Sequence, residues 1–174
     1  MSFTFFSRLS RLLVILFFQV LVFNQIHLFG YITPLMIGYM IVCFHRNTSR
    51  TTTLLWGFAT GLLFDMFSNT AGMAAAACTL AAMIQQPLLN VMTPHDTGNE
   101  MTPSFSTLGF WNYMFYVLVL MLVLHTAFYL LDAFTLANWK LTTLSIICSS
   151  LFATITIFFI ELLVRPRNKE IYQH

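Results

Sequence analysis

Asp65 is the side chain with the strongest potential for chemistry, because it is a carboxylate inside an apolar stretch. It follows Gly57 and Gly61 at intervals of four residues, so the three residues fall on one face of an expected helix. An acid within a membrane segment is energetically unfavourable, and it therefore normally faces protein or water. Two interpretations follow. The carboxylate binds the free amides at the start of the next helix, or it contacts a buried partner or substrate, and the two roles are compatible.

Two further pairs of ionisable residues have helical spacing. His125 and Asp132 are seven residues apart, which suits either a proton relay or two separate roles, with Asp132 solvated and His125 packed in the bundle. Glu161 and Arg165 are four residues apart, which predicts an ion pair whose arginine extends to the lipid headgroups.

The remaining reactive side chains form no pattern that is typical of an enzyme. The five histidines are scattered, and the sequence contains no HExxH, GxSxG or phosphate-binding loop. The three cysteines are odd in number and lack a CxxC, which disfavours a disulfide framework or a zinc site. We therefore expect no catalytic residues, metal or cofactor, and a role in binding or scaffolding. Basic residues lie at segment ends without interleaved aromatic residues, so no nucleic-acid partner is expected.

Composition indicates an integral membrane protein. The chain has 174 residues, of which 58% are hydrophobic and 8% are charged, whereas soluble domains carry about 25% charged residues. The apolar run after Arg8 and Arg11 lacks a small-residue cleavage site, so it predicts an uncleaved first membrane helix rather than a signal peptide. No repeat or domain boundary is visible, and residues 1–174 are expected to form a single membrane domain.

Apolar stretches of suitable length predict an all-α bundle of six transmembrane helices, each needing roughly 20 residues. Residues 1–10 are expected to form an amphipathic lead at the membrane surface, and the polar segment 92–109 a loop. Gly30 and Tyr31 predict a tight hairpin, and Pro87 is expected in the last turn of the fourth helix or just past a break. The expected helices cover about residues 11–29, 31–45, 53–67, 71–91, 110–131 and 140–164.

The distribution of charge predicts the orientation of the bundle. Seven of the eight basic residues, all except Lys140, fall on the side of the two termini. The positive-inside rule makes that side cytoplasmic. The 92–109 loop carries Asp96 and Glu100 but no lysine or arginine, so helices 53–67 and 71–91 are less firmly placed and could form a shallower hairpin.

The spacing of Gly57 and Gly61 is a GxxxG pattern, which lets helix backbones approach closely in membranes. The next expected helix is rich in small residues from Ala71 and Gly72 onward. Two interpretations remain, namely close packing within the chain or recruitment of another protein's helix. We take Gly57, Gly61, Asp65 and Gly72 as the candidate residues of a helix-packing or partner interface.

The same stretch resembles a known family. Gly57-Phe-Ala-Thr-Gly61-Leu-Leu-Phe-Asp65, followed by the small-residue turn that ends in Gly72, is similar to the Gly-Leu-x-x-Asp signature of the rod shape-determining protein MreD family. The Pro34 segment and the short basic loop at 45–50 also fit the family layout. Only residues 57–72 are specific, and the 92–109 loop and the last two helices carry no matching motif.

The resemblance implies a multi-pass protein of the bacterial inner (cytoplasmic) membrane, without catalytic activity, in the machinery of cell elongation. The implied partners are an MreC-like bitopic protein, a RodA-type glycosyltransferase with its transpeptidase, directly or indirectly, and MreB filaments indirectly, besides membrane lipid. The family's fold is also similar to the substrate-binding subunits of energy-coupling-factor transporters. Fold likeness alone does not transfer function. The alternative function is a small-molecule (vitamin-type) binding subunit of a membrane transporter, because the short helices 31–45 and 53–67 and the polar 92–109 loop could shape a cavity.

Overall fold

The computed structural model describes residues 2–23, 34–93, 102–133 and 139–164, with the side chains of 2–5, 7 and 106 left aside. This part of the chain is all-helical, as the sequence predicts. The elements are the α-helices α1 (Ser2–Phe18), α2 (Gly38–Val42), α3 (Arg50–Ser68), α4 (Met73–Met92), α5 (Phe105–Leu108), α6 (Phe110–Asp132) and α7 (Trp139–Val164), with the π-helix η1 (Gln19–Phe23) directly after α1.

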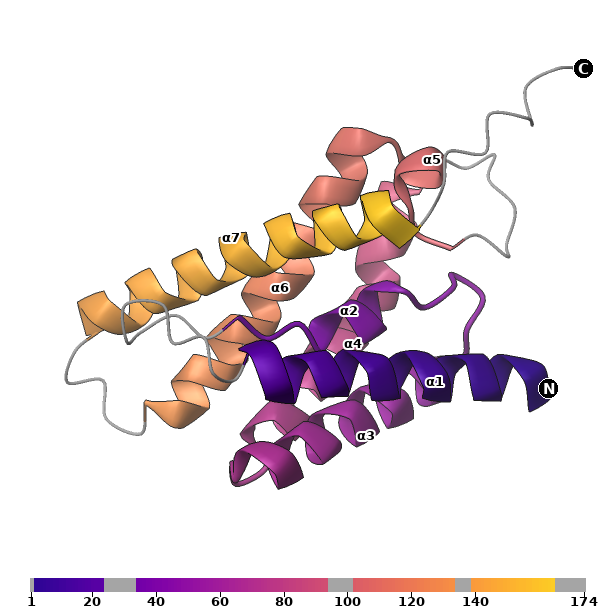
Figure 1. Ribbon diagram of the computed structural model, residues 1–174. Coiled ribbons are helices and arrows are strands. Elements are labelled where there is room, and N and C mark those ends of the chain that lie inside the picture. The colour runs from indigo at the N-terminus through magenta and orange to yellow at the C-terminus, as the bar shows by residue number, and fades with distance from the viewer. Residues whose placement is uncertain (1, 24–33, 94–101, 134–138, 165–174) are drawn as a thin grey trace, which may run out of the picture.

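The long helices pack in sequence order. Helix α3 packs on α4, α4 packs on α6, and α6 packs on α7. Helix α1 lies in front of the bundle, and the short α2 lies in its middle, where it contacts α1, α3, α4 and α6 (Figure 1). The start of α1 and the end of α7 lie at the same end of the molecule (Figure 1).

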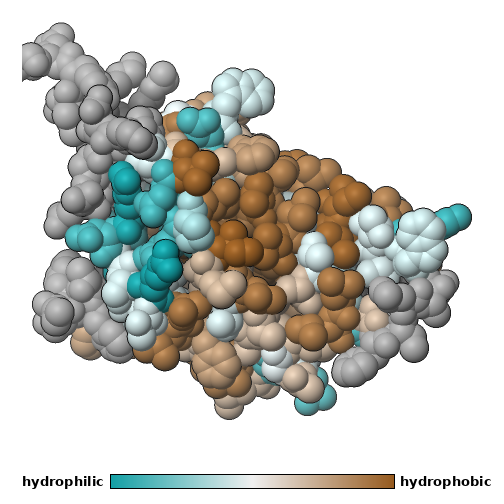
Figure 2. Space-filling view, turned by 180° about the vertical axis from the view of Figure 1, so that it is seen from behind, coloured by the Kyte–Doolittle hydropathy of each residue, from teal (hydrophilic) through white to brown (hydrophobic). Residues whose placement is uncertain are grey.

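Three of the described helices are long and apolar enough to cross a membrane, namely Met73–Met92, Phe110–Asp132 and Trp139–Leu163. Large apolar side chains are exposed along the bundle, and the rear face carries a broad hydrophobic area beside a hydrophilic end (Figure 2). Length and composition therefore support a membrane protein. Six spanning helices remain a prediction for which the described ranges offer three clear candidates.

The expected helix over 31–45 is wrong in its described part. Only Gly38–Val42 is helical there, and five residues rise about 7.5 Å, far less than the roughly 30 Å of a hydrocarbon core. Every residue from Pro34 to Phe44 is buried. This apolar run therefore belongs to the protein interior, which is the more common place for apolar segments of about 10–14 residues.

Two other expectations differ from the structure. Residues 2–10 are not a separate surface lead, because α1 runs from Ser2 to Phe18 without a break. No glycine or proline interrupts this stretch, and the inward-facing Leu12 and Leu16 anchor it to the core. Helix α4 continues through Pro87 to Met92, since membrane helices tolerate proline when neighbouring groups satisfy the freed carbonyl. The expected hairpin at residues 30–31 lies outside the described residues.

The expected loop 92–109 contains a helical turn, α5. Ser104 and Thr107 cap this turn reciprocally, because each side chain bonds to the backbone amide of the other residue. Phe105 then contacts the rings of Tyr113 and Phe158, with centroid distances of 4.7 and 5.0 Å. The aromatic contacts fix the turn between α6 and α7.

Candidate functional site

Asp65 joins the end of α3 to the start of α4. Its side chain is buried, and its two carboxylate oxygens accept separate backbone hydrogen bonds, from Ala74 N to Oδ1 at 3.0 Å and from Ala75 N to Oδ2 at 2.9 Å. The hydroxyl of Thr70 also donates to Oδ1. The N-cap residue of α4 is Gly72, which has no side chain to accept from these amides. Asp65 supplies the missing acceptor, so the first interpretation of this residue is confirmed.

The turn between the two helices depends on two residues with left-handed backbone. Asn69, the C-cap of α3, has φ 54° and ψ 39°, and Gly72 has φ 79°. A Cβ built on Gly72 meets no atom within 4 Å. The requirement at Gly72 is therefore its backbone conformation, which glycine adopts most readily. The structure places Gly72 in the turn rather than on the face where α3 and α4 pack.

Gly57 and Gly61 lie where the backbones of α3 and α4 approach most closely. A Cβ at Gly61 would lie 2.5 Å from the Cα of Ala75 and would also overlap the carbonyl group of Ala74. A Cβ at Gly57 would lie 2.8 Å from the Cβ of Ala82 and 3.1 Å from a backbone oxygen of α4. Helix α4 therefore covers the glycine face within the chain.

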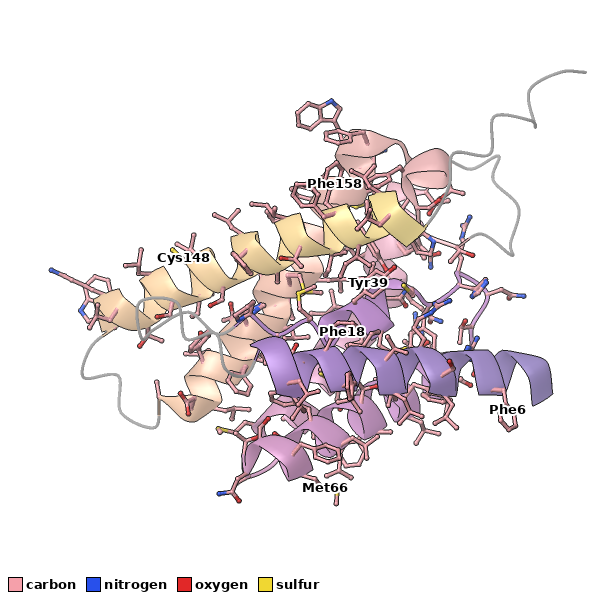
Figure 3. The ribbon with its side chains drawn as sticks, viewed as in Figure 1. Phe6, Phe18, Tyr39, Met66, Cys148 and Phe158 are labelled. Atoms are coloured by element: carbon pink, nitrogen blue, oxygen red, sulfur yellow. The ribbon has the colours of Figure 1, made fainter. Side chains whose placement is uncertain are left out.

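The opposite face of α3 is apolar and exposed. Leu55, Phe58, Leu62 and Met66 follow one another at helical spacing and are 63%, 48%, 41% and 73% exposed. Met66 points away from the bundle (Figure 3). Although α3 has a charged residue near each end, its outward surface resembles that of the three candidate membrane helices.

A second polar site surrounds the central segment, which we define as Pro34–Phe44, and its partners were not expected from the sequence. At its beginning, the buried amide of Gln19 bonds the backbone twice. Gln19 Nε2 donates to the Pro34 carbonyl at 3.1 Å, and the Met36 amide donates to Gln19 Oε1 at 2.6 Å. Gln19 is the first residue of η1. The sequence signal for this site was a single amide side chain within an apolar run.

His125 holds the same end of the central segment from α6. The Leu35 amide donates to His125 Nε2 at 3.2 Å, and His125 Nδ1 lies 2.8 Å from the Met121 carbonyl oxygen. An imidazole that accepts at Nε2 and donates at Nδ1 is neutral. Asp132 is exposed at the end of α6, whereas His125 is fully buried. The described hydrogen bonds of His125 go to Leu35 and Met121 rather than to Asp132, which favours the alternative with two separate roles.

The end of the central segment is bonded by side chains from α4 and α6. Gln85 Nε2 donates to the Phe44 carbonyl at 3.4 Å and to Tyr116 Oη at 3.1 Å. The Tyr116 hydroxyl donates to the Val42 carbonyl at 3.5 Å. Backbone that is not regularly helical is tolerated inside a membrane protein only when its polar groups find such partners or face water.

Glu161 connects α7 to the central segment. Its Oε2 accepts a hydrogen bond from the Tyr39 hydroxyl at 3.2 Å, and the carboxylate is buried. Tyr39 lies in the middle of the bundle (Figure 3). The expected partner Arg165 lies outside the described residues. The structure thus assigns to Glu161 an interior contact that its spacing to Arg165 did not suggest.

The hydrogen bonds of Asp65 and those around the central segment hold helices and backbone in place. In the described ranges, no three His, Cys, Asp or Glu side chains are close enough together to hold a metal ion. The polar side chains come from η1, α3, α4, α6 and α7, and their described partners are mostly backbone groups at helix or segment ends. This arrangement stabilises one packing of the bundle.

The chain matches no family model, no curated protein and no solved structure in the three comparisons made. The likeness to the MreD family therefore depends on residues 57–72 and stays a prediction.

Proposed function

We propose that this protein is a non-enzymatic membrane scaffold of the bacterial cell-elongation complex, where it supports rod shape and lateral peptidoglycan synthesis. The observation that carries the proposal is the engagement of Asp65. This residue is the strongest candidate for chemistry in the sequence, yet both of its oxygens bind the first amides of α4. A carboxylate used in this way holds a helical hairpin together.

The partners in this proposal come from the family resemblance. They are an MreC-like bitopic protein in direct contact, a RodA-type glycosyltransferase with its transpeptidase, directly or through that protein, and MreB filaments through it. Rigid packing supports such a role, because a scaffold must present one stable surface to its partners. The close approach of α3 and α4 at Gly61 and the bonded central segment both favour a single packing.

Depletion of the protein in its native cell tests the proposal. We expect rod-shaped cells to swell or become round, and an affinity-tagged chain in mild detergent to copurify with an MreC-like protein. A strain that expresses Asp65→Asn at the normal level contains the chain but lacks the carboxylate, so it tests the role of the carboxylate alone. Normal cell shape after complete depletion, together with no MreC-like partner, would rule the scaffold out.

The buried central segment favours a second candidate, a small-molecule binding subunit of a transporter. In transporters, short or broken helices inside the bundle often form the substrate site, and here α2 is short and polar side chains bond the central segment on either side of it. This candidate predicts copurification with ATPase subunits and saturable binding of a vitamin-sized ligand. Ligand binding that displaces the hydrogen bonds of Gln19 and His125 to the central segment would favour the transporter subunit over the scaffold.

A further inference from the structure

Several arginines of the described chain lie at the same end of the bundle. The guanidinium carbon of Arg8, near the start of α1, lies 5.2 Å from the centroid of the Phe44 ring, where the central segment ends. Two residues later, Arg46 Nε donates to Asn90 Oδ1 on α4 at 3.1 Å. Arg50 is the first residue of α3. Helix α1, the loop before α3 and the end of α4 therefore meet here.

These contacts hold the guanidinium groups of Arg8 and Arg46 in place. Each group still has N–H donors that can bind a ligand. The cation–π contact of Arg8 is not a conventional hydrogen bond, so it leaves N–H donors of the guanidinium available. Arg46 uses Nε for Asn90, and guanidinium has further donors on its two terminal nitrogens. Arg11 follows Arg8 by three residues on α1 and is exposed. We call Arg8, Arg11, Arg46 and Arg50 the arginine end.

The described acidic side chains are engaged or lie elsewhere. Asp65 binds the amides of Ala74 and Ala75. Asp132 terminates α6, which runs away from the end where α1 begins (Figure 1). Glu161 is buried and accepts from Tyr39. The local charge that the described residues present at the arginine end is therefore positive.

Exposed apolar side chains lie next to the arginines. On α1, Phe6 is 71% exposed and Leu13 is 58% exposed, and on α3 Leu55, in the second turn of the helix that Arg50 begins, is 63% exposed. Phe6 points outward from the bundle (Figure 3). Hydrophilic surface at this end adjoins the hydrophobic band of the rear face (Figure 2). Guanidinium groups at the margin of an apolar surface lie at the depth of lipid headgroups when that surface is in a membrane.

We propose that the arginine end binds the phosphodiester group of anionic phospholipids. Guanidinium binds phosphate oxygens through two parallel N–H donors, which gives both charge and directional recognition. The neighbouring apolar side chains would contact the acyl chains of the same lipid, so the site prefers a phospholipid to a free phosphate ester. This proposal is independent of any role in cell elongation.

Lipid retention by the full chain, purified in a mild nonionic detergent, tests the proposal by native mass spectrometry. Both lipids carry a phosphodiester, but the quaternary ammonium of choline brings a positive charge close to the arginines, so we expect phosphatidylglycerol to bind at least about ten-fold more tightly than phosphatidylcholine. The double variant R8Q/R46Q should weaken phosphatidylglycerol binding about 25-fold, or about five-fold for each arginine, and leave phosphatidylcholine unchanged. Equal retention of the two lipids by the unmodified chain would overturn the proposal.

Lys140 provides a matched control, because it is an exposed cation on the first turn of α7, 5.8 Å from the ring centroid of Trp139. K140Q should leave phosphatidylglycerol binding unchanged, and an effect as large as that of R8Q/R46Q would contradict a specific site. Glycerol 3-phosphate should bind far more weakly than the lipid, and equal affinity would assign the site to a free phosphate ester instead.

A salt titration of the unmodified chain tests the same site without any substitution, should R8Q/R46Q fail to fold. Raising the salt concentration from about 0.05 M to about 0.5 M shortens the Debye length severalfold. Phosphatidylglycerol retention should fall while phosphatidylcholine retention stays constant. Retention of phosphatidylglycerol that does not respond to salt would refute the electrostatic basis of the proposal.

Discussion

Replacing Asp65 is the sharpest test of how the α3–α4 hairpin is stabilised. Asp65→Leu removes the acceptor of Ala74 N and of Ala75 N, which are held at 3.0 and 2.9 Å. Loss of an N-cap destabilises by about 0.5–2 kcal/mol, and a hydrogen bond to a charged group contributes about 1.5–3 kcal/mol. Because Asp65 provides two such bonds in a buried site, we expect a loss of about 2–4 kcal/mol in the free energy of unfolding.

Asp65→Asn should be intermediate, for a geometric reason. The two amides bind different oxygens of the carboxylate, and an asparagine side chain has only one acceptor oxygen. One amide would keep its partner while the other would face an NH₂ donor. We therefore expect roughly half the loss of Asp65→Leu, about 1–2 kcal/mol. Equal losses from both variants would show that the negative charge itself is the stabilising feature.

The assay is equilibrium unfolding of the purified chain in mixed micelles, followed by far-ultraviolet circular dichroism. The matched control is Asp132→Asn, because Asp132 is an exposed carboxylate at the end of α6. Substitutions at such surface sites usually change stability by less than about 0.5 kcal/mol. Unfolding of Asp65→Leu at the same midpoint as the wild-type protein would refute the capping argument.

Further substitutions test the α3–α4 packing and the central segment, by the level of folded protein for Gly61→Leu and by the same unfolding measurement for the others. Gly61→Leu should prevent accumulation of folded protein. Gly61→Ala should destabilise the protein more than Gly57→Ala, because a Cβ at Gly61 meets only α4 backbone whereas the nearest atom at Gly57 is a methyl group. A larger loss of stability from Gly57→Ala would contradict this argument. Gln19→Leu should cost about 2–4 kcal/mol by leaving two backbone groups unpaired, and a neutral effect would show that they find other partners. Tyr39→Phe should cost about 0.6–1.7 kcal/mol through the lost bond to Glu161, with Tyr129→Phe, whose hydroxyl is 3.0 Å from Ser149 Oγ, as an interhelical comparison.

Much of the helical arrangement follows from local sequence. Long apolar runs bounded by polar residues predicted α3, α4, α6 and α7 to within a few residues, because helix formation depends on neighbours along the chain. The contact of Asp65 with the start of α4 was also predictable, since Ala74 is only nine residues away across a short turn. A carboxylate at the end of one helix lies close to the free amides of the next helix when the turn between them is short.

The position of the central segment in the protein interior was not predicted from the sequence. Leu35–Phe44 is apolar enough for a membrane helix, and an apolar residue has the same preference for lipid as for a protein core. The tertiary structure alone surrounds the segment with other helices and buries it. The apolar composition therefore could not distinguish a spanning helix from the short α2, and only the short length of the run pointed to the interior.

The hydrogen bonds between residues far apart in the sequence could not be predicted either. Leu35 and His125 are 90 residues apart, and Tyr39 and Glu161 are 122 residues apart. The spacing of ionisable residues along one helix suggested local partners, Asp132 for His125 and Arg165 for Glu161, because helical periodicity relates only residues of the same helix. By itself the sequence determined an apolar, all-helical chain with a capped hairpin at Asp65. Only the packing of α6 and α7 around the central segment decided which buried side chains meet, because those contacts depend on how separate helices are placed in space.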